Sequence, residues 1–182
     1  MKLTLEGIKD RKVWEEAGIS LPSYDVGAVA EATRKKPVWV HFGAGNIFRI
    51  FIGGIADVLI AQGGSDRGIT CAETFDFDVI EKIYRPYDNL VLGVTLKTDG
   101  STDKKVIGAI TEALKAQAGE TEDWKRLKDI FADPGLQIAS FTITEKGYAL
   151  KGADGAYFPF IQADIDKGPE KAVSAMAVMC SL

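Results

Sequence analysis

The sequence is poor in the residues that build metal centres and disulfide frameworks. It has one histidine and two cysteines in 182 residues. The single histidine, His41, cannot form a histidine-rich metal cluster, so we expect no metal site within this chain. Cys71 falls within an expected strand and Cys180 lies near the end. We expect both to be reduced core residues, not partners in a disulfide.

Long apolar stretches and excess positive charge are also missing. No apolar run approaches the length of about 18 residues that spans a bilayer. The first residues, 1–7, lack the apolar segment of a signal peptide. The net charge of −4 argues against a nucleic-acid surface. We therefore expect a cytoplasmic protein without membrane or nucleic-acid partners. Its 46% apolar and 26% charged residues are ordinary for a globular domain with a real core.

Expected strands and helices alternate along the chain, which predicts an α/β fold. The fold class that follows is a doubly wound, mostly parallel sheet with helices on both faces. The strands are expected at 37–42, 69–74, 90–97, 104–110 and 136–144, with 104–110 as the hairpin partner of 90–97 and 136–144 as a buried strand. The helices are expected at 12–17, 25–35, 46–62, 78–84, 121–132 and 169–182. Residues 1–36 are expected to form a leader packed on the core, and residues 37–182 a nucleotide-binding domain.

The segment 38–49 is the most informative part of the sequence. Strand-forming residues lead into Gly43-Ala44-Gly45, and apolar residues then recur at helical spacing from Ile47. Such a turn offers an anion free backbone N–H groups and the positive end of a helix dipole. Gly43 would permit the tight turn, and Gly45 would allow a pyrophosphate to approach the backbone.

The glycine motif is incomplete, because Phe48 occupies the third position of the G-x-G-x-x-G pattern. A tight turn that binds no ligand therefore remains an alternative. Asn46 is expected to cap the helix more than to contact a ligand. Arg49 is expected either to approach the cofactor phosphates or another domain, or to be a surface residue.

Two acids follow the second expected strand. An acid at this place accepts hydrogen bonds from the adenosine ribose of a dinucleotide. Glu73 is the first candidate, although it lies farther from Gly45 than the usual distance of about 20 residues. Asp76 is the second candidate, and either acid could instead cap the helix near Asp78. Because an acid here would repel a 2′-phosphate, we expect NAD in preference to NADP.

A polar cluster follows the last expected strand. Thr144, Glu145 and Lys146 stand at its carboxyl end, where ligands of open α/β sheets bind. They could line the nicotinamide side of a cleft, or form a solvated turn with a helix cap. Nothing in the sequence lowers the pKa of Lys146, so we do not expect it to be a catalytic base.

Three segments resemble the polyol-specific long-chain dehydrogenases, a family that includes mannitol dehydrogenases and fructuronate and tagaturonate reductases. His41-Phe-Gly-Ala-Gly-Asn-Ile-Phe-Arg49 is similar to the family's His-Leu-Gly-Leu-Gly-Asn-Phe-His-Arg and departs from it at Phe48. Leu21-Pro-Ser-Tyr-Asp25 resembles Leu-Pro-x-Tyr-Asp. The third segment, Ile138–Tyr148, is similar to Val-Ser-Leu-Thr-Ile-Thr-Glu-Lys-Gly-Tyr. The resemblance covers only the family's N-terminal half.

The resemblance implies the NAD-binding domain of an oxidoreductase that interconverts a polyol or sugar acid and its ketone. It places the catalytic lysine in a C-terminal helical domain without counterpart here, so this chain alone is expected to be inactive and to expose apolar surface near Met176, Val178 and Met179 that favours self-association. The alternative is a non-catalytic nucleotide-binding module. The expected cofactor contacts are Gly43, Ala44, Gly45, Asn46, Ile47, Phe48, Arg49, Glu73, Asp76, Thr144 and Glu145.

Overall fold

A four-stranded parallel sheet forms the centre of the molecule. The computed structural model describes residues 1–182, except for the side chain of Lys146. The central strands are β2 (Trp39–Phe42), β3 (Ile69–Glu73), β6 (Ile110–Lys115) and β7 (Ile138–Phe141). They lie in the order β6-β3-β2-β7, and every neighbouring pair is parallel. All four carboxyl ends therefore meet at one edge of the sheet.

Helices cover both faces of this sheet, because alternate side chains of each strand point to opposite sides. On one face, Cys71 packs in a core with α2 (Val26–Lys35), α3 (Gly53–Ala61) and a π-helical segment, Ile80–Tyr84. On the other face, Phe42 packs in a core with α5 (Glu122–Ala132) and α8 (Ala175–Cys180). The predicted doubly wound α/β architecture is confirmed.

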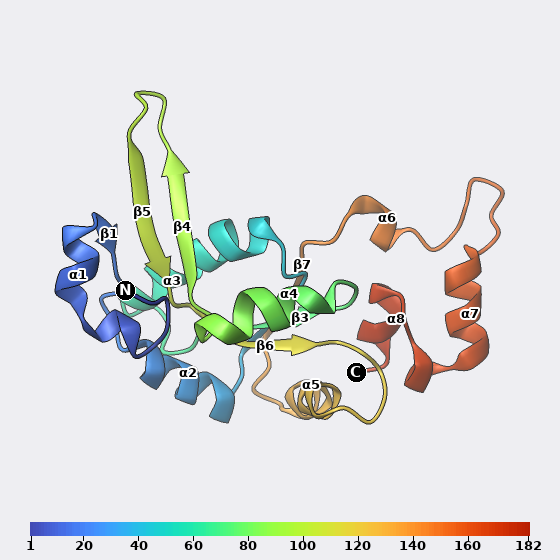
Figure 1. Ribbon diagram of the computed structural model, residues 1–182. Coiled ribbons are helices and arrows are strands. Elements are labelled where there is room, and N and C mark those ends of the chain that lie inside the picture. Colours follow the sequence, from blue (N-terminus) through green and yellow to red (C-terminus); the bar gives the residue numbers. More distant parts are fainter.

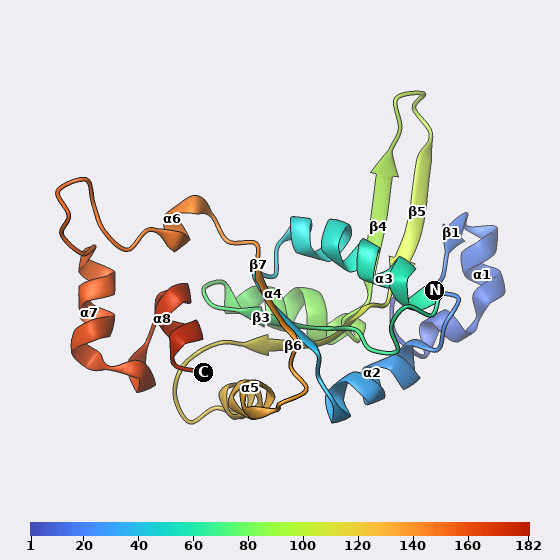
Figure 2. The same ribbon diagram turned by 180° about the vertical axis from the view of Figure 1, so that it is seen from behind.

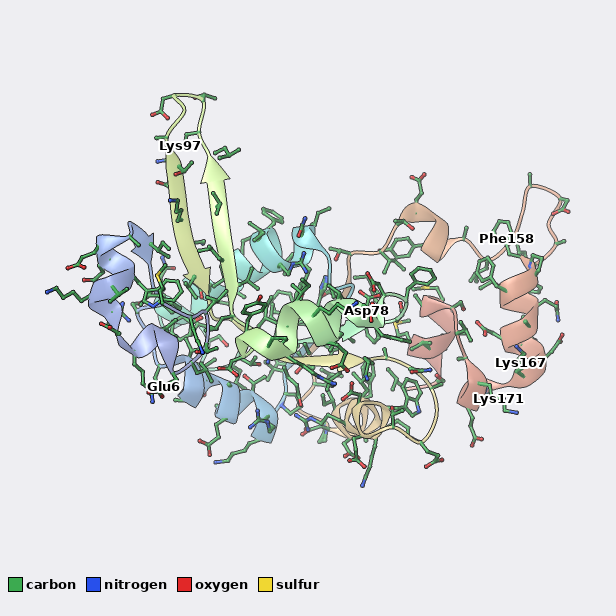
Figure 3. The ribbon with its side chains drawn as sticks, in the orientation of Figure 1. Glu6, Asp78, Lys97, Phe158, Lys167 and Lys171 are labelled. Carbon is green, nitrogen blue, oxygen red and sulfur yellow. The ribbon has the colours of Figure 1, made fainter. Side chains whose placement is uncertain are left out.

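A second, smaller sheet stands beside the first. β4 (Val91–Leu96) and β5 (Thr102–Ile107) form the predicted antiparallel hairpin, and β1 (Ile19–Ser20) pairs parallel with β5. The hairpin projects well beyond the rest of the chain in both views (Figure 1, Figure 2). Lys97 lies near its far end (Figure 3).

The leader is fastened to this region by its Leu-Pro-x-Tyr-Asp segment. The hydroxyl of Tyr24 donates to Oδ1 of Asp57 at 2.6 Å, and the same oxygen accepts from the N–H of Gly108 at 2.9 Å. Asp25 caps α2 by accepting from Ala28 N. Asp57 is buried on α3, so its carboxylate joins the leader, α3 and the turn between β5 and β6. Short helix α1 (Arg11–Glu16) completes the leader. The division at residue 36 stays a prediction.

Several expected elements differ from those observed. β6 was not predicted as a strand separate from the hairpin. β7 is shorter than predicted and is not buried, because it is an edge strand with Ile138 45% exposed. The helix predicted at 46–62 begins as a π-helical segment, Ile47–Ile52, before α3, and the one predicted at 78–84 is α4 (Phe77–Val79) followed by Ile80–Tyr84.

The end of the chain also differs from the prediction of one helix over 169–182. It contains α6 (Glu145–Tyr148), α7 (Pro159–Lys167), a 3₁₀ turn at Pro169–Lys171 and then α8. Residues 172–174 are not helical. Figure 3 shows Lys167 and Lys171 at the bend between α7 and α8. Gly168 stands at this bend with φ of +80°, which a helix does not allow.

Apolar exposure lies elsewhere than expected. Val178 on α8 is only 1% exposed, because it packs in the core beside α5. Five exposed apolar side chains follow one another instead along the π-helical turn and α3: Ile47, Phe51, Ile55, Val58 and Leu59. Among the described helices, none is both long enough and apolar enough to cross a membrane.

Candidate nucleotide-binding cleft

The turn after β2 is built as the sequence predicted. Gly43 has φ of +109°, and a Cβ added there would lie 2.6 Å from the carbonyl oxygen of Thr142. No L-residue fits this backbone without strain. At Gly45 a Cβ would meet nothing within 4 Å, so the space beside this residue is open. Backbone conformation and packing thus require glycine at position 43. At position 45, glycine leaves the space beside the turn open to a ligand.

Backbone N–H groups of the turn are only partly free. The N–H of Gly43 donates to Ala72 O, and that of Ala44 donates to Glu73 Oε2 at 2.9 Å. The N–H groups of Gly45 and Asn46 have no partner among the residues that the structure describes. These two donors stand at the start of the helical segment, where the helix dipole favours an anion.

Glu73 joins the ends of β2 and β3. Besides Ala44 N, its carboxylate accepts from Thr74 N and Phe75 N at 2.9 Å and from Asp76 N at 3.4 Å. These bonds hold the carboxylate beside the glycine turn. Asp76 occupies the position before α4, but its side chain makes no capping hydrogen bond, so the expected cap is absent there.

A cleft of about 600 Å³ opens at the carboxyl edge of the sheet. One side is formed by the glycine turn and by the residues that follow β3. The other side comes from the segment after β7 and from α7 and α8. Its lining residues are Gly43, Ala44, Gly45, Glu73, Thr74, Phe75, Thr142, Ile143, Thr144, Gly147, Phe160, Val173, Ser174 and Ala175.

Asp164 fixes the far wall of the cleft. It lies on α7, is buried, and accepts from Val173 N and Ser174 N, both at 2.9 Å. Burial opposes its ionisation, but hydrogen bonds from Ser174 and Val173 outweigh burial and hold the pKa of the carboxyl below its usual value. Ser174 in turn caps α8 through Ala177 N. The carboxylate therefore ties α7 to the start of α8.

His41 lies beneath the cleft and is fully buried. Its Nδ1 lies 2.8 Å from Ser140 Oγ, and its Nε2 lies 2.9 Å from Thr142 Oγ1. Burial lowers the pKa of His41 to about 4, so the ring is neutral at pH 7. Its ring stacks on Phe48 with centroids 4.2 Å apart. This stack gives Phe48 a packing role at the position where the usual motif has glycine.

Asn46 and Arg49 contact each other. The Asn46 side chain makes no cap to the helix, so that expectation was wrong; its Oδ1 accepts from Arg49 Nη2 instead. The Arg49 guanidinium lies over the Tyr84 ring, 5.9 Å from its centroid. Arg49 is half-buried and does not line the cleft.

The cleft brings together five of the eleven expected contacts: Gly43, Ala44, Gly45, Glu73 and Thr144. The other six expected residues, Asn46, Ile47, Phe48, Arg49, Asp76 and Glu145, are outside its lining. The side chain of Lys146 lies outside the described residues. Sequence reasoning missed the wall formed by Phe160 and residues 173–175, since α7 was not predicted. Thr142 could have been predicted as a cleft residue, because it stands directly after β7.

Comparison with known proteins identifies relatives. The chain is 44% identical over 182 residues to D-mannonate oxidoreductase of Thermotoga maritima, covering all of this chain and 34% of that protein. It is 30% identical over 169 residues to polyol:NADP oxidoreductase of Gluconobacter oxydans, covering 85% of this chain and 31% of the relative. No protein-family profile matches it.

A solved structure agrees with these relatives. Mannitol 2-dehydrogenase of Pseudomonas fluorescens, in a ternary complex with NAD and D-mannitol, superposes with a TM-score of 0.72 and 25% identity, over 90% of this chain and 32% of that one. The chain spans about a third of the length of these proteins. The resemblance is thus confirmed: the chain is similar to the N-terminal, Rossmann-like part of proteins named D-mannonate oxidoreductase and mannitol 2-dehydrogenase.

Proposed function

We propose that the cleft binds NAD, and that the chain is the cofactor-binding part of an oxidoreductase that interconverts a polyol or sugar-acid alcohol and its ketone by hydride transfer. The observation that carries this proposal is the glycine turn. It presents the free N–H groups of Gly45 and Asn46 at a helix start, beside open space and a fixed carboxylate. Pyrophosphate would sit on the two N–H groups, and the adenosine ribose would lie near Glu73.

The orientation of the dinucleotide follows from the strand order. β3 and β7 lie on opposite sides of β2. Glu73 ends β3 and would take the adenosine half, so the nicotinamide half would extend toward Thr144 after β7. Bound nicotinamide cofactor supplies the hydride acceptor or donor; the residues of this chain bind it and orient it. A small polyol or sugar acid would be the substrate of the intact enzyme.

The preference for NAD over NADP rests on the charge of Glu73. A carboxylate held at this place would repel a 2′-phosphate. One relative is named as an NADP enzyme and one similar structure holds NAD, so similarity alone leaves the choice open. The cytoplasmic location expected from the sequence stays a prediction.

Calorimetry with NAD and NADP tests the proposal. The unchanged chain should bind NAD more tightly than NADP. Glu73→Gln keeps the size of the side chain but removes its charge, so the preference for NAD should fall by about tenfold. Asp76→Asn is the matched control and should leave the preference unchanged. Equal binding of both nucleotides by the unchanged chain contradicts the assignment of NAD. A loss of preference in Asp76→Asn alone would assign the ribose to Asp76.

A further inference from the structure

Four side chains form a hydrogen-bonded line from the core to the cleft, here named the His41 network. Trp39 Nε1 donates to Ser140 Oγ at 2.6 Å, and Ser140 Oγ lies 2.8 Å from His41 Nδ1. His41 Nε2 then lies 2.9 Å from Thr142 Oγ1. Trp39 and His41 come from β2, and Ser140 and Thr142 from β7 and its end. Thr142 lines the cleft.

Trp39 determines which group donates and which accepts in each hydrogen bond of the network. An indole N–H can only donate, so Ser140 Oγ is an acceptor toward Trp39. The Ser140 hydroxyl proton then needs an acceptor, and His41 Nδ1 is the acceptor within reach among the described residues. If Nδ1 accepts, the proton of the neutral imidazole is on Nε2, which donates to Thr142 Oγ1.

The opposite arrangement satisfies fewer groups. With the proton on Nδ1, Ser140 Oγ would receive two donors and its own hydroxyl proton would have no acceptor among the described residues. Ser140 is only partly buried, so in that arrangement its proton would depend on solvent instead of a fixed protein acceptor. The ring itself is neutral, because burial disfavours its charged form. The first arrangement therefore leaves one hydroxyl proton unused, that of Thr142, on the cleft side.

We propose that the His41 network turns the Thr142 hydroxyl into a hydrogen-bond donor directed into the cleft, where it binds an oxygen acceptor of the dinucleotide. Thr142 Oγ1 would lie 3.1 Å from a Cβ placed on Gly43, so the hydroxyl stands beside the glycine turn. The acceptor is a pyrophosphate oxygen or the carboxamide oxygen of nicotinamide. This assignment rests on the proposed function, whereas the direction of the network does not. His41 is a positioning residue that acts through Thr142.

The tautomer of His41 tests the direction of the network. His41 is the only histidine, so a ¹⁵N-labelled sample gives one imidazole spin system without assignment by mutation. We expect the neutral form with the proton on Nε2 at pH 7. A proton on Nδ1, or a charged ring at that pH, would overturn the proposal. Thr142→Ser should keep the Nε2–H form, and Thr142→Val should weaken the preference because it removes the acceptor.

The affinity for nucleotides tests whether Thr142 contacts the ligand and which oxygen is its acceptor. Thr142→Val should weaken NAD binding by about 3- to 10-fold, the effect of one lost hydrogen bond, and Thr142→Ser should restore it. ADP-ribose, which has the pyrophosphate but no nicotinamide, separates the two acceptors. An equal loss for both ligands assigns the pyrophosphate, and a loss for NAD alone assigns the carboxamide. Unchanged affinity of Thr142→Val for both refutes the contact.

The experiments distinguish a failure of the proposed function from a failure of the inferred hydrogen-bond network. If the unchanged chain binds neither NAD nor NADP, the proposed function and the ligand of Thr142 both fail. The tautomer of His41 then still decides whether the network has the inferred direction.

Discussion

The two glycines of the turn have different roles, Gly43 in stability of the fold and Gly45 in ligand binding. Substitution by alanine distinguishes these roles. Gly43→Ala should lower the free energy of unfolding by roughly 2–4 kcal/mol, because φ of +109° and the Thr142 carbonyl both exclude a Cβ. Gly45→Ala is the matched variant. Its Cβ meets open space, so stability should change by less than about 1 kcal/mol, while NAD affinity falls. Denaturant unfolding and calorimetry measure the two effects. Equal destabilisation by both variants would contradict the distinction.

The buried histidine predicts a dependence of stability on pH. The folded pKa of His41 is about 4 and the unfolded value about 6.5. The unfolded chain therefore binds more protons between these values, and stability falls as the pH drops through that window. Between pH 7.5 and 5.5, the free energy of unfolding should decrease by about 1–2 kcal/mol from this group.

The variant His41→Gln provides the control for this dependence. It carries no histidine, so its stability should be nearly constant from pH 7.5 to 5.5, although lower at pH 7.5. Urea unfolding at several pH values measures both proteins. The same slope in His41→Gln as in the unchanged chain would assign the dependence to other groups.

Secondary structure was predictable where local pattern determined it. The glycine turn, the β4–β5 hairpin and α5 follow from local residues, since each has its own turn chemistry or apolar period. α5 even shows its cap, with Thr121 accepting from Trp124 N. β6 was missed because only two residues separate it from β5, and its role as a parallel neighbour of β3 depends on long-range pairing. Pairing between distant strands leaves little trace in a single sequence.

The far wall of the cleft shows the same limit at the level of the site. Glu73 and Thr144 were predictable because Glu73 ends β3 and Thr144 follows β7 closely. Phe160 and Ser174 reach the cleft only through the bend at Gly168 and the carboxylate of Asp164. No local sequence pattern indicates which carboxylate will be buried in this way.

Helix α8 should depend on Asp164. Asp164→Ala removes the acceptor of Val173 N and Ser174 N, so two backbone donors lose their partner. Hydrogen exchange over 173–180 should accelerate about tenfold or more, because the cost of each lost charged hydrogen bond is roughly 1.5–3 kcal/mol. Asp166→Ala is the control: among the described residues, Asp166 accepts only from the exposed Gln162 amide within α7, and exchange should stay unchanged.

The stability of helix α8 should also depend on pH. The pKa of Asp164 is lowered in the folded protein. Its contribution is therefore present above the unfolded pKa and is lost as the pH falls through the folded one. Exchange over 173–180 should rise toward acid pH after correction for intrinsic rates, and Asp164→Ala should abolish that rise.

The whole chain is expected to lack catalytic turnover of mannitol, fructuronate or tagaturonate. Hydride transfer from an alcohol needs a base within hydrogen-bond reach of the hydroxyl. Among the described residues that line the cleft, Glu73 is the only ionisable acid or base, and four backbone N–H groups hold its carboxylate. A steady-state assay by NADH absorbance checks this expectation. Turnover that survives Glu73→Gln would show a base elsewhere in the chain.

The surface of the whole molecule predicts self-association of this chain through the face formed by Ile47, Phe51, Ile55, Val58 and Leu59. These side chains are 45–66% exposed along one side of a continuous helical stretch, and contiguous apolar surface of this kind promotes association. Phe51→Glu and Ile55→Glu place charge in the middle of the face. Each should shift light scattering of the purified chain toward the monomer at concentrations where the unchanged chain associates. Val13→Glu on α1 is the control, because Val13 is 39% exposed but lies on a different helix. An equal effect of the control would attribute association to net charge, which all three variants change by the same amount, and a monomeric unchanged chain would contradict the prediction.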